Sequence, residues 1–348
     1  MIWFWVGFFA FVAVLLALDL GVLNRNPHAP SLKSAAYWTA GWMALGFAFT
    51  GLVYLMYEHA WLGATLVEPT EAPGSDASIM YVSAYLLEYA LSVDNIFVIS
   101  LLFHSFRVPA KYQHRVLFWG IMGAIVFRLA MLGGGAWLAQ QFSWIFYVFG
   151  GYLAWQGFKL LRHDEDDDPS SEKSFAVRTL RKFVRIVDGD YNGKFSVMVD
   201  GRRALTTIAV CLISIELTDI VFALDSIPAV LSVSQDIFIM VTSNIFAIMG
   251  LRSLYFVLAG AMDKFKYLKI ALAILLMMIG LKMILHNHLH VPHVMSLGLI
   301  AGIIGAGVVA SMVSSRRAGP QPDQSLLESL PPPPPEPDPV DPPRARPR

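Results

Sequence analysis

The sequence predicts an all-α membrane protein with about nine transmembrane helices. Of the 348 residues, 56% are hydrophobic and only 15% are charged, which is far from the balance of a water-soluble domain. Long apolar stretches recur along the chain, and the basic residues between them are concentrated in alternate loops. These observations together indicate a chain that crosses a bilayer many times.

The predicted membrane helices are the stretches of roughly 20 apolar residues, the length that the hydrocarbon core requires. Nine stretches qualify: 2–23, 37–57, 79–103, 116–138, 143–161, 205–230, 237–258, 268–285 and 293–313. Residues 1–313 are therefore expected to form one polytopic transmembrane domain. The segment 314–348 is rich in proline and cannot bury a core, so we expect a disordered cytoplasmic tail.

The distribution of Lys and Arg predicts the orientation, because cytoplasmic loops retain basic residues. Basic residues occur in the tail and in the loops near 24–36, 104–115, 162–204 and 259–269. None occurs in the alternate loops near 58–78, 139–142, 231–236 and 286–292. We therefore expect a multi-pass protein of the cell (inner or plasma) membrane with its N-terminus outside and its C-terminus in the cytoplasm.

The cytoplasmic loop 162–204 contains a pattern that is typical of strands. Two turn-forming pairs flank a short run of alternating apolar residues: Asn192-Gly193, Asp200-Gly201 and, between them, Phe195, Val197 and Val199. This arrangement predicts a small cytoplasmic β-hairpin between the fifth and sixth helices.

Two segments of the chain carry the same order of acidic residues. Glu88 precedes Asp94 in the third helix at the same spacing at which Asp219 precedes Asp225 in the sixth. The register continues through two further matched pairs: Arg128 with Arg252, and Lys159 with Lys282. Because each unit contains three helices, helices 3–5 and 6–8 are predicted to form an inverted repeat, an arrangement typical of secondary transporters.

Six carboxylates fall inside the predicted membrane helices: Asp19, Glu88, Asp94, Glu216, Asp219 and Asp225. Each would cost about 3 kcal/mol at a lipid-facing helix centre, so these side chains are expected to face the bundle interior. Four bases fall there too and are expected to act as counter-charges: Arg128, Arg252, Lys159 and Lys282. The surplus of negative charge favours a divalent cation as a ligand, and the alternative is that the acids only pair with the bases and fix helix packing.

The spacing of the acids limits how they can act together. Two acids six residues apart on a straight helix point about 120° apart and are separated by about 9 Å along its axis. Either the helices are interrupted, with Pro228 and the glycines at 133–135 as the expected places, or the ion lies between one acid from each repeat. Asn95, Ser226 and possible relay residues Asp19 and Asn244 complete the candidate metal site. Lys159 and Lys282 lie near helix ends, where we expect them to anchor the helices at the membrane interface.

The ligand types narrow the choice of ion. Carboxylate, amide and hydroxyl oxygens suit Mg²⁺, Ca²⁺ and Mn²⁺, whereas Zn²⁺ and Cu(I) favour imidazole or thiolate. The acidic helices contain no His, and the outer-loop cluster is loosely spaced, so it is either a solvated loop or a surface metal-capture site: His286, His288, His290 and His293. We expect a divalent ion as substrate and no permanently bound cofactor.

Several other classes of function lack support in the sequence. The formal net charge is zero, so there is no basic excess for nucleic acid to bind. Cys211 is the only cysteine and cannot form an intramolecular disulfide. No phosphate-binding loop, serine nucleophile elbow or zinc-protease helix is present, and we expect the protein not to be an enzyme.

The acidic segments resemble the signature helices of the TerC family of integral membrane proteins. The resemblance lies in residues 87–97 (LEYALSVDNIF) and 216–229 (ELTDIVFALDSIPA), with further matches at 17–22 (ALDLGV) and 243–255 (SNIFAIMGLRSLY). It extends over roughly residues 10–313. The family is named for tellurium resistance, includes Alx-type proteins and belongs with LysE to a wider transporter superfamily. The resemblance implies manganese export, with the membrane acids as the metal site.

The leading hypothesis is a secondary transporter that exports Mn²⁺ or a similar hard divalent cation through carboxylates at mid-membrane depth, with proton exchange on the same carboxylates as an open option. The alternative is a non-transporting accessory protein, or a redox- or pH-responsive protein, in tellurite or metal-stress resistance. The expected partners are the divalent metal ion and the lipid bilayer. Ion movement by the purified protein alone would separate these hypotheses.

Overall fold

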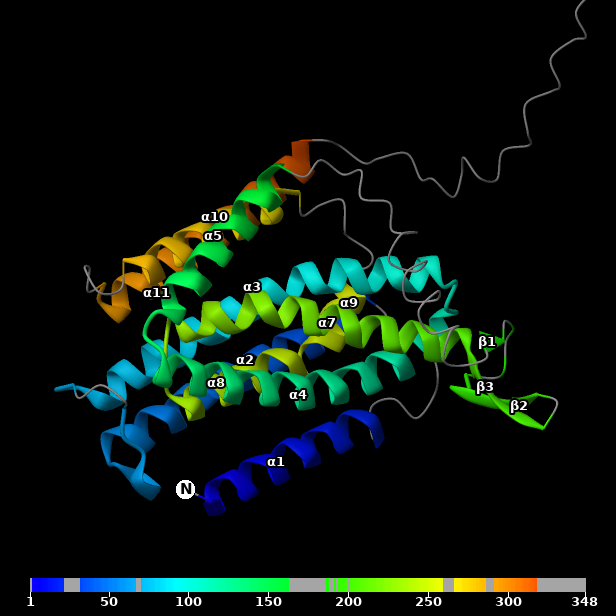
Figure 1. The fold of residues 1–348 in the computed structure, drawn as a ribbon, viewed down its shortest axis with the longest axis horizontal. Helices are drawn as coiled ribbons and strands as arrows, with labels where there is room; N and C mark the ends of the chain where they lie inside the picture. The colour runs from blue at the N-terminus through cyan, green and yellow to red at the C-terminus, as the bar shows by residue number, and fades with distance from the viewer. Residues whose placement is uncertain are drawn as a thin grey trace, which may run out of the picture.

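The computed structural model is dominated by α-helices, with one short 3-10 helix and a small sheet (Figure 1). It describes residues 2–21, 32–66, 70–162, 186, 187, 189, 191, 193–199, 201–258, 266–285 and 291–317. The helices are α1 (Ile2–Gly21), α2 (Leu32–Glu58), α3 (Pro73–Ser105), α4 (Ala110–Gln141), α5 (Ile145–Arg162), α7 (Thr207–Leu231), α8 (Ile237–Met249), α9 (Leu251–Leu258), α10 (Lys266–Ile284) and α11 (His293–Arg317).

Each of the nine predicted membrane segments contains helix, with α8 and α9 sharing one segment. Within the described residues, six helices are long and apolar enough to cross a membrane, and the bent pair α8–α9 would be a seventh span. The described apolar part of α1 is shorter, and Gln156, Lys159 and Arg162 lower the hydropathy of α5. The structure therefore supports a multi-pass membrane protein, and the count of nine spans stays a prediction.

The helices pack as two groups that meet along one side of α3 and α7 (Figure 1). In the larger group, α3 lies against α2, α7 and α8, and α4 lies against α7 and α8. Aromatic rings fix α1 to this group, because Phe8 contacts both Phe49 of α2 and Phe246 of α8. In the smaller group, α10 packs against α5 on one side and α11 on the other.

The predicted places of helix interruption were wrong. α4 continues through the glycines at 133–135, and α7 continues through Pro228 to Leu231. Pro228 lacks the N–H that would bond the Leu224 carbonyl, but this is a single bond near the end of α7, and Ser232 N–H still donates to the Pro228 carbonyl at 3.0 Å. Gly135 instead allows close packing, because an added Cβ would lie 2.9 Å from the Ile227 side chain. The actual break is at Gly250, where α8 and α9 meet at a bend of 43°.

A three-stranded sheet precedes α7, with strand order β1-β3-β2. β2 (Ser196–Val199) and β3 (Arg202–Thr206) form the antiparallel hairpin that the sequence predicts, and Gly201 adopts the positive φ of 71° in its turn. β1 (Ile186–Val187) adds a parallel strand that the sequence did not predict. β3 runs directly into α7, and the Thr206 side chain caps that helix by accepting a hydrogen bond from Ala209 N–H.

The segment between α7 and α8 is held by a second helix cap. The carboxylate of Asp236 accepts hydrogen bonds from the backbone N–H groups of Phe238 at 2.8 Å and Ile239 at 3.3 Å. Burial raises the pKa of Asp236 above its usual range, against the lowering effect of these hydrogen bonds. Asp236 therefore fixes the start of α8.

Candidate functional site

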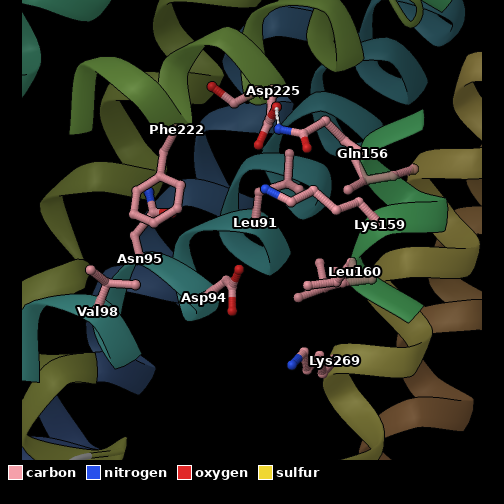
Figure 2. A pocket seen from close by; sticks show the side chains of 13 residues that line it. Leu91, Asp94, Asn95, Val98, Gln156, Lys159, Leu160, Phe222, Asp225 and Lys269 are labelled. Atoms are coloured by element: carbon pink, nitrogen blue, oxygen red, sulfur yellow. Dashed lines mark hydrogen bonds between the residues drawn. The ribbon is translucent and has the colours of Figure 1, made fainter. Parts of the chain in front are cut away.

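One pocket brings together an acid from each half of the predicted repeat. It has a volume of about 340 Å³ and lies where α5 and α10 meet α3 and α7. Its polar lining consists of Asp94 and Asn95 from α3, Gln156 and Lys159 from α5, Asp225 and Ser226 from α7, and Lys269 from α10 (Figure 2). Apolar side chains such as Leu91, Phe222 and Leu276 complete the wall. We call this space the Asp94–Asp225 pocket.

Asp225 is oriented by neighbours on α5. Its Oδ1 accepts a hydrogen bond of 2.9 Å from Gln156 Nε2, which also donates to the Tyr152 hydroxyl at 3.0 Å. Gln156 and Tyr152 are one helical turn apart, so a single face of α5 presents both groups to α7. Figure 2 shows the amide of Gln156 directed at the Asp225 carboxylate. Asp225 is therefore held in place by neutral groups, which leave its charge available to a cation.

Two lysines face the two carboxylates of the pocket. Lys159 attracts Asp225 electrostatically, and Lys269 attracts Asp94. Figure 2 shows Lys159 on the side of the pocket near Asp225 and Lys269 on the side near Asp94. The pocket therefore contains two formal negative and two formal positive charges, carried by different helices.

A second group of charges surrounds Arg128 of α4, and we call it the Arg128 cluster. Arg128 forms ion pairs with Glu88 of α3 and with Asp219 of α7, whose two oxygens accept hydrogen bonds of 2.8 Å and 3.1 Å from Nη2 and Nε. Arg128 is 1% exposed and Glu88 is fully buried. Because one guanidinium joins carboxylates from both halves of the repeat, this cluster fastens α3, α4 and α7 together.

Asn95 connects the two groups. In the amide orientation that satisfies its neighbours, its nitrogen donates to the Leu91 carbonyl at 3.2 Å and its oxygen accepts from Arg128 Nη2 at 3.1 Å. Asn95 thus lines the Asp94–Asp225 pocket with one side and contacts the Arg128 cluster with the other. Ser226 Oγ, in the same pocket wall, is buried and has no hydrogen-bond partner among the described residues.

The remaining predicted residues lie outside this pocket. Asn244 of α8 is buried, and within the described part of the chain its Nδ2 has no hydrogen-bond partner. Glu216 packs directly against Gly123 of α4. Arg252 of α9 lies near His114 of α4. Asp19 belongs to α1, but its side chain lies outside the described residues.

The two matched lysines have different surroundings. Lys159 lines the Asp94–Asp225 pocket, so membrane anchoring does not describe its whole environment. Lys282 Nζ donates hydrogen bonds of 3.1 Å to the Ser232 carbonyl and 3.0 Å to Ser296 Oγ. Ser232 is the C-cap of α7, where a cation is favoured by the helix dipole. Lys282 therefore secures the end of α7 against α10 and α11.

The structure divides the predicted acidic site in two. Asp94 and Asp225 share one pocket with Asn95 and Ser226, whereas Glu88 and Asp219 belong to the Arg128 cluster. Among the described residues, no group of three or more His, Cys, Asp or Glu side chains is arranged to hold a metal ion. A cation in the Asp94–Asp225 pocket would therefore need neutral oxygens beside the two carboxylates.

Sequence reasoning missed Gln156 and Lys269. Gln156 had a signal, since it is a polar residue one turn from Lys159 in an otherwise apolar helix. Lys269 lies at the start of α10 and was counted among the basic residues of a cytoplasmic loop. The outer histidines His286, His288 and His290 lie outside the described residues, and His293 begins α11.

Comparisons with known proteins give consistent matches over most of the chain. The family model described as "Integral membrane protein TerC family" matches residues 74–319. An uncharacterized membrane protein of Myxococcus xanthus is 41% identical over 315 residues, covering 90% of this chain and 93% of its own. The "Putative membrane-bound redox modulator Alx" of Escherichia coli K12 is 40% identical over 301 residues, covering 86% and 91%. No solved structure matches.

Proposed function

The chain belongs to the TerC family of integral membrane proteins, and we propose that it is a secondary transporter that exports Mn²⁺ or a similar hard divalent cation through the Asp94–Asp225 pocket. The observation that carries this proposal is the meeting of Asp94 and Asp225 in one pocket, since α3 and α7, which carry them, are both long and apolar enough to cross a membrane. Ionisable groups at such positions in membrane helices mark ion pathways.

The lining of the pocket supports a hard cation. Its donors within the described residues are carboxylate, amide and hydroxyl oxygens, which suit Mn²⁺, Mg²⁺ and Ca²⁺. Two carboxylates with neutral oxygens bind less tightly than a cage of three or four acids. Moderate affinity suits a transporter, because the ion must leave the site as readily as it enters.

Helix packing supports the inverted repeat on which the proposed transport mechanism depends. The second helix of each unit packs against the first helix of the other, α4 against α7 and α8 against α3. Between α5 and α10, Gly150 meets Gly280, and Gly157 meets Ala273. The register of the sequence repeat matches Gly157 with Gly280 and Gly150 with Ala273. Exchanging the two units therefore converts the Gly150–Gly280 contact into the Gly157–Ala273 contact. A pseudo-two-fold axis between the units would have this property.

The Arg128 cluster takes a structural part in this proposal. Glu88 and Asp219 both form ion pairs with Arg128, so they hold the two units together while Asp94 and Asp225 receive the ion. The redox role in the name of the Alx relatives is not carried by thiol exchange within this chain, because Cys211 is its only cysteine and is buried. No residue of the pocket supports a role in tellurium resistance, the property for which the family is named.

Transport by the purified protein tests the proposal. Proteoliposomes that contain the protein and a Mn²⁺-quenched dye should show Mn²⁺ entry, and Asp94→Asn or Asp225→Asn should reduce it to the level of empty vesicles. Glu71→Gln, which changes an exposed carboxylate outside the pocket, is the matched control and should transport normally. Wild-type vesicles that remain as tight as empty ones would reject the transporter and favour an accessory role.

Competition between ions tests the proposed selectivity. Mg²⁺ demands near-ideal octahedral geometry and releases its water reluctantly, whereas Mn²⁺ binds generally more tightly to such oxygen and nitrogen ligands. An irregular pocket with only two carboxylates should therefore favour Mn²⁺. We expect equimolar Mg²⁺ to compete much more weakly than unlabelled Mn²⁺, and equal competition would contradict the choice of Mn²⁺ while leaving transport itself intact.

A further inference from the structure

Charge balance in the Asp94–Asp225 pocket raises a problem for any divalent ion. The two carboxylates and the two ammonium groups of Lys159 and Lys269 sum to zero formal charge. Adding a divalent cation to this arrangement would leave two positive charges in excess within a pocket of about 340 Å³. Like charges at such short range repel strongly where protein replaces water. The charges of the pocket are therefore balanced without an ion, and a bound divalent ion would be repelled by the two lysines.

The positions of the lysines resolve this problem. Lys159 and Lys269 are both exposed side chains at the edge of the pocket, and neither packs in the core. Lysine carries its charge on a flexible four-carbon stem, so the ammonium can withdraw without moving the backbone. Lys159 Nζ already lies 5.8 Å from the centre of the exposed Trp155 ring, one turn away on the outer face of α5. A resting place outside the pocket is thus within reach.

We propose that Lys159 and Lys269 are tethered competitors of the transported cation, which neutralise Asp94 and Asp225 in the empty pocket and must withdraw when a divalent ion binds. This inference rests on the proposed function and adds that the two lysines set the affinity of the pocket for the ion and the rate of its release. Two bare carboxylates on membrane helices would be costly, and the ammonium groups remove that cost after the ion has left. When the ammonium groups return to the carboxylates, they repel the bound ion and favour its release.

The competition has a specific kinetic signature. If a lysine loses its charge, the cation no longer has to displace it, so binding should tighten by about tenfold or more. The same change should slow release, so turnover should fall as affinity rises. A lysine that merely packed or anchored its helix would not produce opposite changes in these two quantities. A lysine that bound the substrate would raise KM when removed.

Substitutions that remove or keep the charge test the proposal in proteoliposomes. Lys159→Gln and Lys269→Gln should each lower KM for Mn²⁺ by about tenfold and also lower kcat. Lys159→Arg and Lys269→Arg keep the charge and should stay near wild-type values. Lys33→Gln is the matched control, because Lys33 is an exposed lysine of α2 that does not line the pocket, and it should change neither KM nor kcat.

The outcomes separate this inference from the proposed function. Wild-type vesicles that transport Mn²⁺, with unchanged or raised KM in both Gln variants, would overturn the role of the lysines and leave the transporter standing. Equal effects of the Gln and Arg variants would overturn it too, because charge would then be irrelevant. Wild-type vesicles without transport would overturn the proposed function, and the competition with it.

Discussion

The acidic residues of α3 and α7 have two different kinds of surroundings, and Arg128 defines one of them. Its guanidinium binds Glu88 and Asp219 in the interior of the helix group, where it is 1% exposed. Asp94 and Asp225 are also acids of α3 and α7, but their neighbours are exposed lysine side chains and neutral hydrogen-bonding groups. Neighbours, and not residue type, therefore distinguish the acids of the Arg128 cluster from the acids of the pocket.

Removing the guanidinium should destabilise the protein strongly. Arg128→Met would leave two carboxylates without their counter-charge, and breaking a buried ion pair in this way costs about 3–5 kcal/mol. Chemical denaturation in detergent should therefore give a lower free energy of unfolding by about that amount. Arg202→Met, at an exposed position of β3, is the control and should change it by less than about 0.5 kcal/mol. Equal stabilities would mean that Glu88 and Asp219 need no cation.

The sequence predicted one group of membrane acids, but not their division between the Asp94–Asp225 pocket and the Arg128 cluster. Asp94, Asp225, Asn95 and Ser226 were expected together and do share a pocket. The pairing of Glu88 and Asp219 with Arg128 was foreseen only as an alternative, because spacing along a helix does not say which helix will lie opposite. Lys269 was missed for the same reason, since a lysine at a helix start looks like a loop residue until the tertiary fold brings it to Asp94.

At the scale of single helices, the contact between α5 and α10 depends on glycines. An added Cβ at Gly150 would lie 2.7 Å from the Gly280 carbonyl oxygen, and one at Gly157 would lie 2.6 Å from the Ala273 carbonyl oxygen. Small residues at helix crossings allow close backbone approach, which is a common basis of packing in membranes. This close approach holds Lys159 and Lys269 on one rigid pair of helices.

Adjacent glycines of α5 offer a matched test of this contact. Gly150→Ala should lower the free energy of unfolding by about 1–3 kcal/mol, because the new methyl group overpacks the crossing. Gly151→Ala should be neutral or slightly stabilising, since nothing lies within 4 Å of its added Cβ and alanine favours helix. Measuring both variants by the same detergent denaturation cancels differences in helix propensity, and equal losses would show that the crossing tolerates expansion.

Helix positions followed from hydropathy, whereas helix breaks did not. Every predicted apolar stretch contains helix, because a membrane helix is specified by its own composition. The bend at Gly250 escaped prediction, since glycines at 133–135 and Pro228 gave a stronger local signal but are accommodated by packing and by position. The two-residue strand β1 was also missed, because such a short run has no pattern of its own.

For the whole molecule, the membrane orientation can be tested directly. In a Cys211→Ala background, cysteines at Ser75 and Gln235 should react with an impermeant thiol reagent from outside, whereas cysteines at Ser170 and Ser325 should react only after permeabilisation. The expectation follows from the absence of Lys and Arg in the alternate loops. Reaction at position 170 from outside would reverse the orientation and also remove the basis for calling the repeat inverted.

The separation of charges between helix groups has a mechanical consequence. The carboxylates of the pocket belong to α3 and α7, and the ammonium groups belong to α5 and α10, so the seam between two helix groups is also a boundary between opposite charges. Moving the two helix groups apart separates opposite charges and therefore costs electrostatic energy, which is recovered when the groups close. Salt screens charges beyond about 8 Å at physiological ionic strength, and only where water reaches them. The electrostatic attraction between the groups is therefore strong while water is excluded from the seam and becomes weaker once the seam opens and water and salt enter.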